Sequence, residues 1–153
     1  MKNSRGRGVR WGAVALGWSV ASAVGVLLSP AFRFLYGSVA GPPAERGEFT
    51  ATSVAVSLLS GFVAYLLGGY VAGRVAGASG GFNGAMTAVL GLAVGLVLTA
   101  VLALFGVLFS EGVTVPPAGF GFAGAALLAG LLLFLANLMG GYVGGKLGEP
   151  PDA

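Results

Sequence analysis

The residue types that carry out most enzyme chemistry are scarce in this chain. It contains no His and no Cys, and its five acidic residues lie between the apolar segments or near the C-terminus. Ser and Thr occur without a general base nearby, and a nucleophile needs a positioned base. Metal-assisted hydrolysis needs clustered carboxylates or imidazoles, which the sequence lacks. We therefore expect no enzymatic activity, no catalytic residue, no metal site and no cofactor.

Polar residues are few within the apolar segments, and Tyr65 and Asn137 are the notable ones. A polar group in hydrocarbon is costly unless it is paired, so we expect both side chains to face protein rather than lipid. The simpler interpretation is an interhelical hydrogen bond, and the alternative is a constriction or substrate contact. Asn83, which follows Gly80-Gly81, is expected to cap or turn the chain where a helix starts.

The composition indicates that the protein is surrounded by lipid rather than by water. Of 153 residues, 56% are hydrophobic and 8% are charged, whereas a soluble domain carries about 25% charged residues. The charges bracket long uncharged gaps, each able to hold the ~20 apolar residues that cross ~30 Å of hydrocarbon. The apolar runs are continuous rather than alternating, which favours helices over a β-barrel. We predict an all-α membrane protein with four transmembrane helices, at about residues 11–28, 52–73, 84–109 and 120–143.

A basic tail before an apolar run is also typical of a signal peptide. Ala21-Ser22-Ala23 offers a small-residue cleavage pattern, but the apolar run continues through Leu28. The first segment also holds the place in the first half of the chain that the third segment holds in the second half. We therefore interpret it as a retained helix. The domains that we expect are a basic tail at 1–10, a transmembrane domain at 11–148 and a short tail at 149–153.

Positive charges set the expected topology of a chain whose net charge is +3. With the N-terminus inside, the inner side receives six basic residues and the outer side two, which favours both termini in the cytoplasm. The basic tail is expected to bind anionic lipid headgroups, at about 1 kcal/mol for each charge near the surface. A nucleic-acid surface would need basic residues on a folded face with polar or aromatic readers, so we expect no nucleic-acid partner.

Aromatic and basic residues near the segment ends predict interface anchors. Pro30 is expected to kink or stop the first helix. Beyond it, Arg33 stands among aromatic residues and suits an interfacial position, although pairing with a loop acid at an external site is an alternative. In both halves, a Tyr lies one turn before a basic residue at the inner interface. The anchors that we expect are Arg33, Tyr70, Arg74, Tyr142 and Lys146.

The chain reads as one unit used twice. The segment FVAYLLGGYVAGRV at 62–75 returns at 134–147 as FLANLMGGYVGGKL, with eight of fourteen positions identical at an offset of 72 residues. Two spans in each unit keep both units in the same orientation, so the repeat axis is expected along the membrane normal. We predict two tandem parallel helical hairpins, at about 9–77 and 81–149.

Glycines recur every four residues at the ends of the second and fourth segments, and a similar stripe of small residues (Ala13, Gly17, Ala21) follows the first. In lipid, helix association depends on close packing, and flat glycine faces let backbones approach. We expect these faces to pack within the monomer, because each repeat supplies one. The packing residues that we expect are Gly69, Gly73, Gly77, Gly140, Gly141, Gly144 and Gly145.

The end of the second segment, Gly-Gly-Tyr-Val-Ala-Gly-Arg at 68–74, is followed at 80–85 by Gly-Gly-Phe-Asn-Gly-Ala. This pattern resembles a signature of small prokaryotic four-helix membrane proteins of unknown function. The resemblance implies the four-span layout and a multi-pass protein of the prokaryotic cytoplasmic (inner) membrane. It implies no catalytic or ligand residue.

Two functions remain open. The first is a structural or accessory integral membrane protein that packs through glycine-rich helix faces with itself or with a larger membrane complex. The second is a small transporter or channel subunit with a pathway between the two repeats. The lack of charges at membrane depth favours the first. A continuous polar cavity between the repeats, reached by Tyr65, Asn137, Ser57 or Ser60, would favour the second.

Overall fold

The computed structural model of the chain describes residues 8–40, 51–109 and 125–151. These residues contain four α-helices and no β-strand, so the all-α class is confirmed for the described part of the chain. Each helix contains a stretch that is long and apolar enough to cross a membrane. The helices are α1 (Trp11–Ala40), α2 (Ala51–Ala76), α3 (Gly80–Phe109) and α4 (Ala125–Gly148).

The helices run further than the sequence predicted. α1 continues through Pro30 to Ala40, so of the two outcomes expected for Pro30, a kink or a stop, the stop is excluded. Proline removes one backbone hydrogen bond, but an apolar environment offers the remaining backbone groups no partner outside the helix. The glycine-rich ends also stay helical: α2 ends at Ala76 rather than at residue 73, and α4 ends at Gly148 rather than at 143. The expected start of the fourth span, residue 120, lies outside the described residues.

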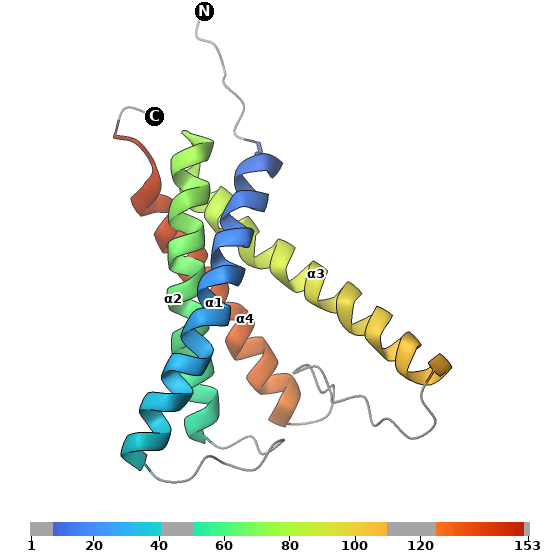
Figure 1. The fold of residues 1–153 in the computed structure, drawn as a ribbon. Helices are drawn as coiled ribbons and strands as arrows, with labels where there is room; N and C mark the ends of the chain where they lie inside the picture. The colour runs from blue at the N-terminus through green and yellow to red at the C-terminus, as the bar shows by residue number, and fades with distance from the viewer. Residues whose placement is uncertain (1–7, 41–50, 110–124, 152–153) are drawn as a thin grey trace, which may run out of the picture.

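The four helices alternate in direction, so the start of α1 and the end of α4 lie at the same end of the bundle (Figure 1). We call this end, which also holds the end of α2 and the start of α3, the terminal end. The most extensive packing is between α2 and α4, and α1 packs mainly on α2. Within the described helices, α1 and α4 do not contact each other. α2 is therefore the helix around which the others are arranged.

α3 leaves the bundle as it runs away from the terminal end. Figure 1 shows its far half pointing away from the other three helices. The fully buried positions of α3 fall between Gly80 and Ala88, and beyond them the large side chains are mostly exposed. Its span is also the most apolar, with a mean hydropathy of 2.7 against 1.7 to 1.8 for the other three. The far half of α3 is thus suited to lipid rather than to the interior of this bundle.

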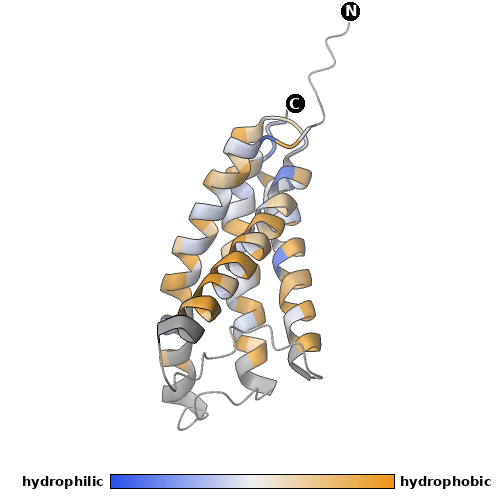
Figure 2. Cartoon of the chain, turned by 90° about the vertical axis from the view of Figure 1, so that its right-hand side faces the viewer, coloured by the Kyte–Doolittle hydropathy of each residue, from blue (hydrophilic) through white to orange (hydrophobic). Residues whose placement is uncertain are grey.

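The interior of the bundle holds small residues and almost no bulky ones. Every buried hydrophobic side chain in the described part is Ala except Val14, while many Leu, Val and Phe side chains are exposed. Hydrophobic residues dominate all four helices, with few hydrophilic positions along them (Figure 2). A soluble domain buries its large apolar residues, whereas helices in lipid associate through small residues that allow close approach. The distribution is that of a protein whose solvent is hydrocarbon.

Candidate functional site: a glycine-packed core and a polar cavity at mid-span

The contact between α2 and α4 joins glycines at equivalent positions of the sequence repeat. A Cβ atom added to Gly69 would lie 2.8 Å from the Cα of Gly141, and one added to Gly73 would lie 2.9 Å from the Cα of Gly145. Both pairs are separated by 72 residues (141 − 69 and 145 − 73), which is the repeat offset. Both separations are shorter than real Cβ contacts, so only glycine permits this approach between two parallel helices.

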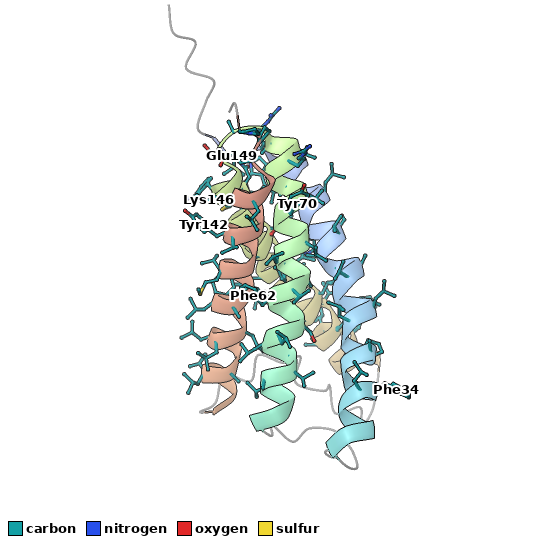
Figure 3. All side chains as sticks on the ribbon, turned by 90° about the vertical axis from the view of Figure 1, so that its left-hand side faces the viewer. Phe34, Phe62, Tyr70, Tyr142, Lys146 and Glu149 are labelled. Atoms are coloured by element: carbon teal, nitrogen blue, oxygen red, sulfur yellow. The ribbon has the colours of Figure 1, made fainter. Side chains whose placement is uncertain are left out.

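A second row of glycines on α4 packs against backbone atoms of α2. An added Cβ at each of these glycines would collide with a carbonyl oxygen of α2, and the colliding residues are spaced by four on both helices. Figure 3 shows the two helices side by side. The pairs are Gly140 with Phe62, Gly144 with Leu66 and Gly148 with Tyr70.

Gly141 and Gly145 of α4, which face α2, also contact α3. Gly84 packs against the backbone of Gly141, and Gly80 packs against the backbone of Gly145. Gly141 and Gly145 therefore lie between α2 and α3. A Cβ added to either would collide with the backbone of α3, and a Cβ on the facing glycines of α2 would collide with them. Thr87 completes the junction, because it is fully buried and its hydroxyl donates a hydrogen bond to the carbonyl of Gly84 at 2.6 Å.

α1 packs on a different face of α2. A Cβ added to Gly17 would lie 2.7 Å from the Cβ of Ala72 and would also collide with the carbonyl of Gly68. Ala21 of the same small-residue stripe lies against Gly68. α2 therefore presents one small-residue face to α1, through Gly68 and Ala72, and another to α4, through Gly69 and Gly73.

Gly77 is not a helix-packing residue, so this part of the expected glycine face was wrong. It lies one residue beyond the end of α2, with φ of +70°, and its N–H donates to the carbonyl of Gly73 at 3.1 Å. An added Cβ would have only Nη1 of Arg10 nearby, at 3.9 Å. Glycine suits this position because a residue that ends a helix with a left-handed backbone conformation carries a steric penalty from its Cβ, and glycine has no Cβ. The glycine at every fourth residue continues past the end of α2, so this spacing alone wrongly predicted that Gly77 packs against a helix.

Four of the five expected interface anchors lie exposed near the terminal end. Tyr70 projects from α2, and Tyr142 and Lys146 project from α4 (Figure 3). Arg74 of α2 is also exposed. The side chain of Arg33 lies outside the described residues, as do the acids of the long loops. The alternative in which Arg33 pairs with one of those acids therefore stays a prediction.

A polar junction at the terminal end joins α1, α2 and α3. Asn83 is fully buried; its Oδ1 accepts a hydrogen bond from the N–H of Arg10 at 2.8 Å, and its Nδ2 donates to the carbonyl of Ser79 at 3.1 Å. Nη1 of Arg10 donates to the carbonyl of Ala76, the last residue of α2. A cation at this position interacts favourably with the negative end of the helix dipole. Arg10, which the sequence placed in the basic tail, is thus part of the folded structure.

The two polar residues singled out within the spans line one cavity. Tyr65 on α2 and Asn137 on α4 are separated by the repeat offset (137 − 65 = 72), and both are half-buried. The cavity has a volume of about 90 Å³ and lies between α2, α3 and α4. Its lining residues are Tyr65, Ala88, Gly91, Leu92, Leu133, Phe134 and Asn137.

Two glycines that the sequence did not single out make room for these polar groups. A Cβ added to Gly91 of α3 would collide with the hydroxyl of Tyr65, and one added to Gly61 of α2 would collide with Oδ1 of Asn137. That oxygen is buried and has no hydrogen-bond partner in the described part of the chain. The interhelical hydrogen bond that we expected for Asn137 is therefore not made through its Oδ1. Each polar residue faces a glycine of another helix, and this pairing cannot be recognised in the sequence until it is known which helices are in contact.

The cavity is local rather than continuous. Neither Ser57 nor Ser60 belongs to its lining. Ser60 is buried, and its hydroxyl donates to the carbonyl of Val56 on its own helix at 2.8 Å. The described residues also contain no group of three or more acidic, His or Cys side chains placed to hold a metal ion.

Four helices that are each long and apolar enough to cross a membrane, packed through glycine, are the features of a multi-pass membrane protein. Comparison of the chain with protein-family models, with curated proteins and with solved structures finds no match in any of the three.

Proposed function

We propose that the chain is a structural or accessory integral membrane protein without catalytic activity. The observation that supports this role is the backbone contact of Gly141 and Gly145 with glycines of α2 on one side and α3 on the other. A core of this kind fixes three helices relative to one another and leaves little space for a reacting substrate. The bulky apolar side chains remain on the outside, where they face lipid or a further helix. The protein packs in the membrane with itself or with a larger complex.

We further propose that the fold derives from two tandem parallel hairpins. The pairs Gly69–Gly141 and Gly73–Gly145 support this, because residues on a twofold axis contact their own equivalents. The outer helices have diverged: Gly84 is buried against α4, whereas an added Cβ at its equivalent, Gly12 (84 − 72), would meet nothing within 4 Å. The proposed symmetry therefore applies to α2 and α4, with α1 and α3 docked in different registers.

The proposed location is a prokaryotic cytoplasmic membrane, with both termini in the cytoplasm and the basic tail on anionic headgroups. Arg10, Arg74 and Lys146 all belong to the terminal end of the bundle, which supports placing that end inside by the positive-inside rule. Membership of the prokaryotic four-helix family that the 68–85 segment resembles belongs to the same proposal.

The test is purification of the full-length protein from native membranes in mild detergent, followed by native mass spectrometry. A stoichiometric partner or a defined homo-oligomer is the expected result. Reconstitution of the same sample into liposomes provides the second measurement. A monomer without a partner that conducts a solute across these liposomes would contradict the accessory role.

The cavity beside Tyr65 and Asn137 favours a second candidate, a small transporter or channel subunit. Its lining contains no charged residue, so an ion would find no compensating charge there. A neutral solute is the better test, and liposome swelling in glycerol measures its entry. Under the accessory role we expect no acceleration of swelling. Acceleration that disappears in the Asn137→Leu variant would support the transporter.

A further inference from the structure

The Tyr65–Asn137 cavity lies at the middle of three spans. Tyr65 is the central residue of the span Val54–Ala76, and Asn137 is next to the centre of the span Leu127–Gly148. Gly91, on the α3 side of the cavity, is within two residues of the centre of Gly80–Phe105. This is the depth at which lipid offers no hydrogen-bond partner to a polar group. Polar atoms here need a partner from the protein or from a bound molecule.

The cavity presents polar groups whose hydrogen-bonding capacity the protein leaves unused. The Tyr65 hydroxyl can donate and accept, and the Asn137 amide can donate twice and accept. Oδ1 of Asn137 is buried against Gly61, without a hydrogen-bond partner in the described residues and without exposure to the cavity, and no hydrogen bond joins the two side chains there. Leaving such groups unpaired at this depth disfavours the folded state. A pair of this kind at equivalent repeat positions is better explained by something that binds between them than by packing.

Glycines keep both polar groups in place and the cavity open. Gly91 lies against the Tyr65 hydroxyl, and Gly61 lies against the Asn137 amide. Any side chain at Gly91 would displace the hydroxyl, and any side chain at Gly61 would displace the amide. The two polar side chains and their glycines come from α2, α3 and α4, so the site depends on the packing of all three helices.

The lining selects the chemical class of the ligand. It contains no ionisable group apart from the Tyr65 phenol, so a charged ligand would be left uncompensated. The volume of about 90 Å³ exceeds the ~10–15 Å³ of probe-occupied volume that one water molecule needs, which suits one small polar group. Leu92, Leu133 and Phe134 surround the remaining space with apolar atoms. The far half of α3 points away from the other three helices (Figure 1), and the cavity is only partly enclosed.

We infer that this cavity is a binding site for an uncharged hydroxyl group, held between the Tyr65 hydroxyl and the Asn137 amide. The hydroxyl belongs either to a small polyol from water or to the end of an alkyl alcohol from the bilayer. The site is independent of the accessory role proposed above, since a structural protein and a transporter could both contain it.

Trp18 supplies a built-in reporter. Its Cδ1 lies 3.2 Å from the point that a Cβ of Gly91 would occupy, so it lies next to a lining residue of the cavity and near the Tyr65 hydroxyl. The only other Trp, Trp11, is exposed and can be replaced by Phe. Bromine quenches Trp fluorescence on contact, and the chain has no Cys or His that a bromoalcohol would alkylate.

The experiment titrates the Trp11→Phe protein in nanodiscs with three brominated probes. 6-Bromo-1-hexanol represents the alkyl alcohol, 3-bromo-1,2-propanediol represents the polyol, and 1-bromohexane is the matched probe without a hydroxyl. We expect at least one hydroxylated probe to quench Trp18 saturably and the bromoalkane to quench without saturation. Displacement by unlabelled 1-hexanol or by glycerol then assigns the source of the hydroxyl.

Two variants test the site. Tyr65→Phe and Asn137→Leu should each weaken saturable quenching about tenfold or more, because each leaves a hydroxyl without its partner. Asn137→Leu should not lower folded yield, since it removes an unpaired polar group. Thr99→Val is the control, because it removes a hydroxyl from the α3 span that bonds only to Gly95. Quenching by the alcohols that matches the bromoalkane, or that survives in both variants, would overturn the proposal.

Discussion

Gly145 on α4 lies against the backbone of Gly73 on α2, its equivalent in the sequence repeat, and against the backbone of Gly80 on α3. One residue without a side chain therefore sets the distance between three helices. The first prediction follows from this contact.

Replacing Gly145 with Leu should destabilise the protein more than any single change on the outer surface. The new side chain must displace the backbone of α3 at Gly80 and Gly84, which places the cost at or above the ~3 kcal/mol upper range of overpacking. Gly73→Leu should be the next most severe. The measurement is thermal unfolding in detergent. Gly95→Leu is the matched control, since an added Cβ there meets nothing within 4 Å. Equal melting temperatures for the three variants would show that the glycines reflect composition alone.

A related prediction separates packing within the monomer from packing between copies. If the Gly73 face belongs to the monomer, Gly73→Leu lowers the yield of folded protein without first changing its oligomeric state. Size-exclusion chromatography with light scattering measures both. A stable dimer that dissociates into a folded monomer on this substitution would instead place the face at an oligomer interface.

The polar junction at the terminal end gives a third prediction. Asn83→Ala removes the acceptor of the Arg10 N–H and two donated hydrogen bonds to the α2–α3 turn. The Arg10 N–H is only partly buried, so losing its acceptor costs less than the ~1–3 kcal/mol of a fully buried donor; the variant should still melt earlier, and hydrogen exchange should rise at the start of α1. Ser19→Ala, which removes an exposed hydrogen bond within α1, is the control. A rise confined to α3 would show that Asn83 does not hold α1.

The divergence of the two hairpins is testable by a pair of equivalent substitutions. Gly12→Leu and Gly84→Leu change the same repeat position, but only Gly84 is packed against another helix. We expect Gly84→Leu to reduce folded yield severely and Gly12→Leu to be tolerated. Equal losses would mean that α1 and α3 dock alike.

The topology can be mapped by labelling, because the chain contains no Cys. A single Cys introduced after residue 153 and one within 41–47 should react with impermeant maleimide from opposite sides of intact cells. We expect the residue after 153 to be protected until the cells are lysed. Labelling of both positions from the same side would rule out four spans.

The sequence was sufficient for the features that depend on one helix at a time. Charge-free gaps predicted four apolar helices, and the repeated glycines predicted the faces of α2 and α4 that pack closely. It was not sufficient for features that depend on which helices meet. The facing of Gly61 by Asn137 and of Gly91 by Tyr65 follows from helix crossings, and spacing along one chain does not encode these. Gly77 fitted the spacing of four, yet its positive φ ends the helix, which a pattern of residue types cannot distinguish.

The small-residue interior has a consequence for how the bundle forms. Helices in a bilayer form before they associate, so the backbone entropy of the glycines is already lost when α2 meets α4. Gly and Ala have no side-chain rotamers to restrict, whereas each buried Leu or Ile gives up about 0.5–1 kcal/mol of rotamer freedom. Residues such as Gly69, Gly141 and Ala72 therefore dock at almost no entropic cost from side chains. At these positions the helices meet with no side-chain rotamer to restrict.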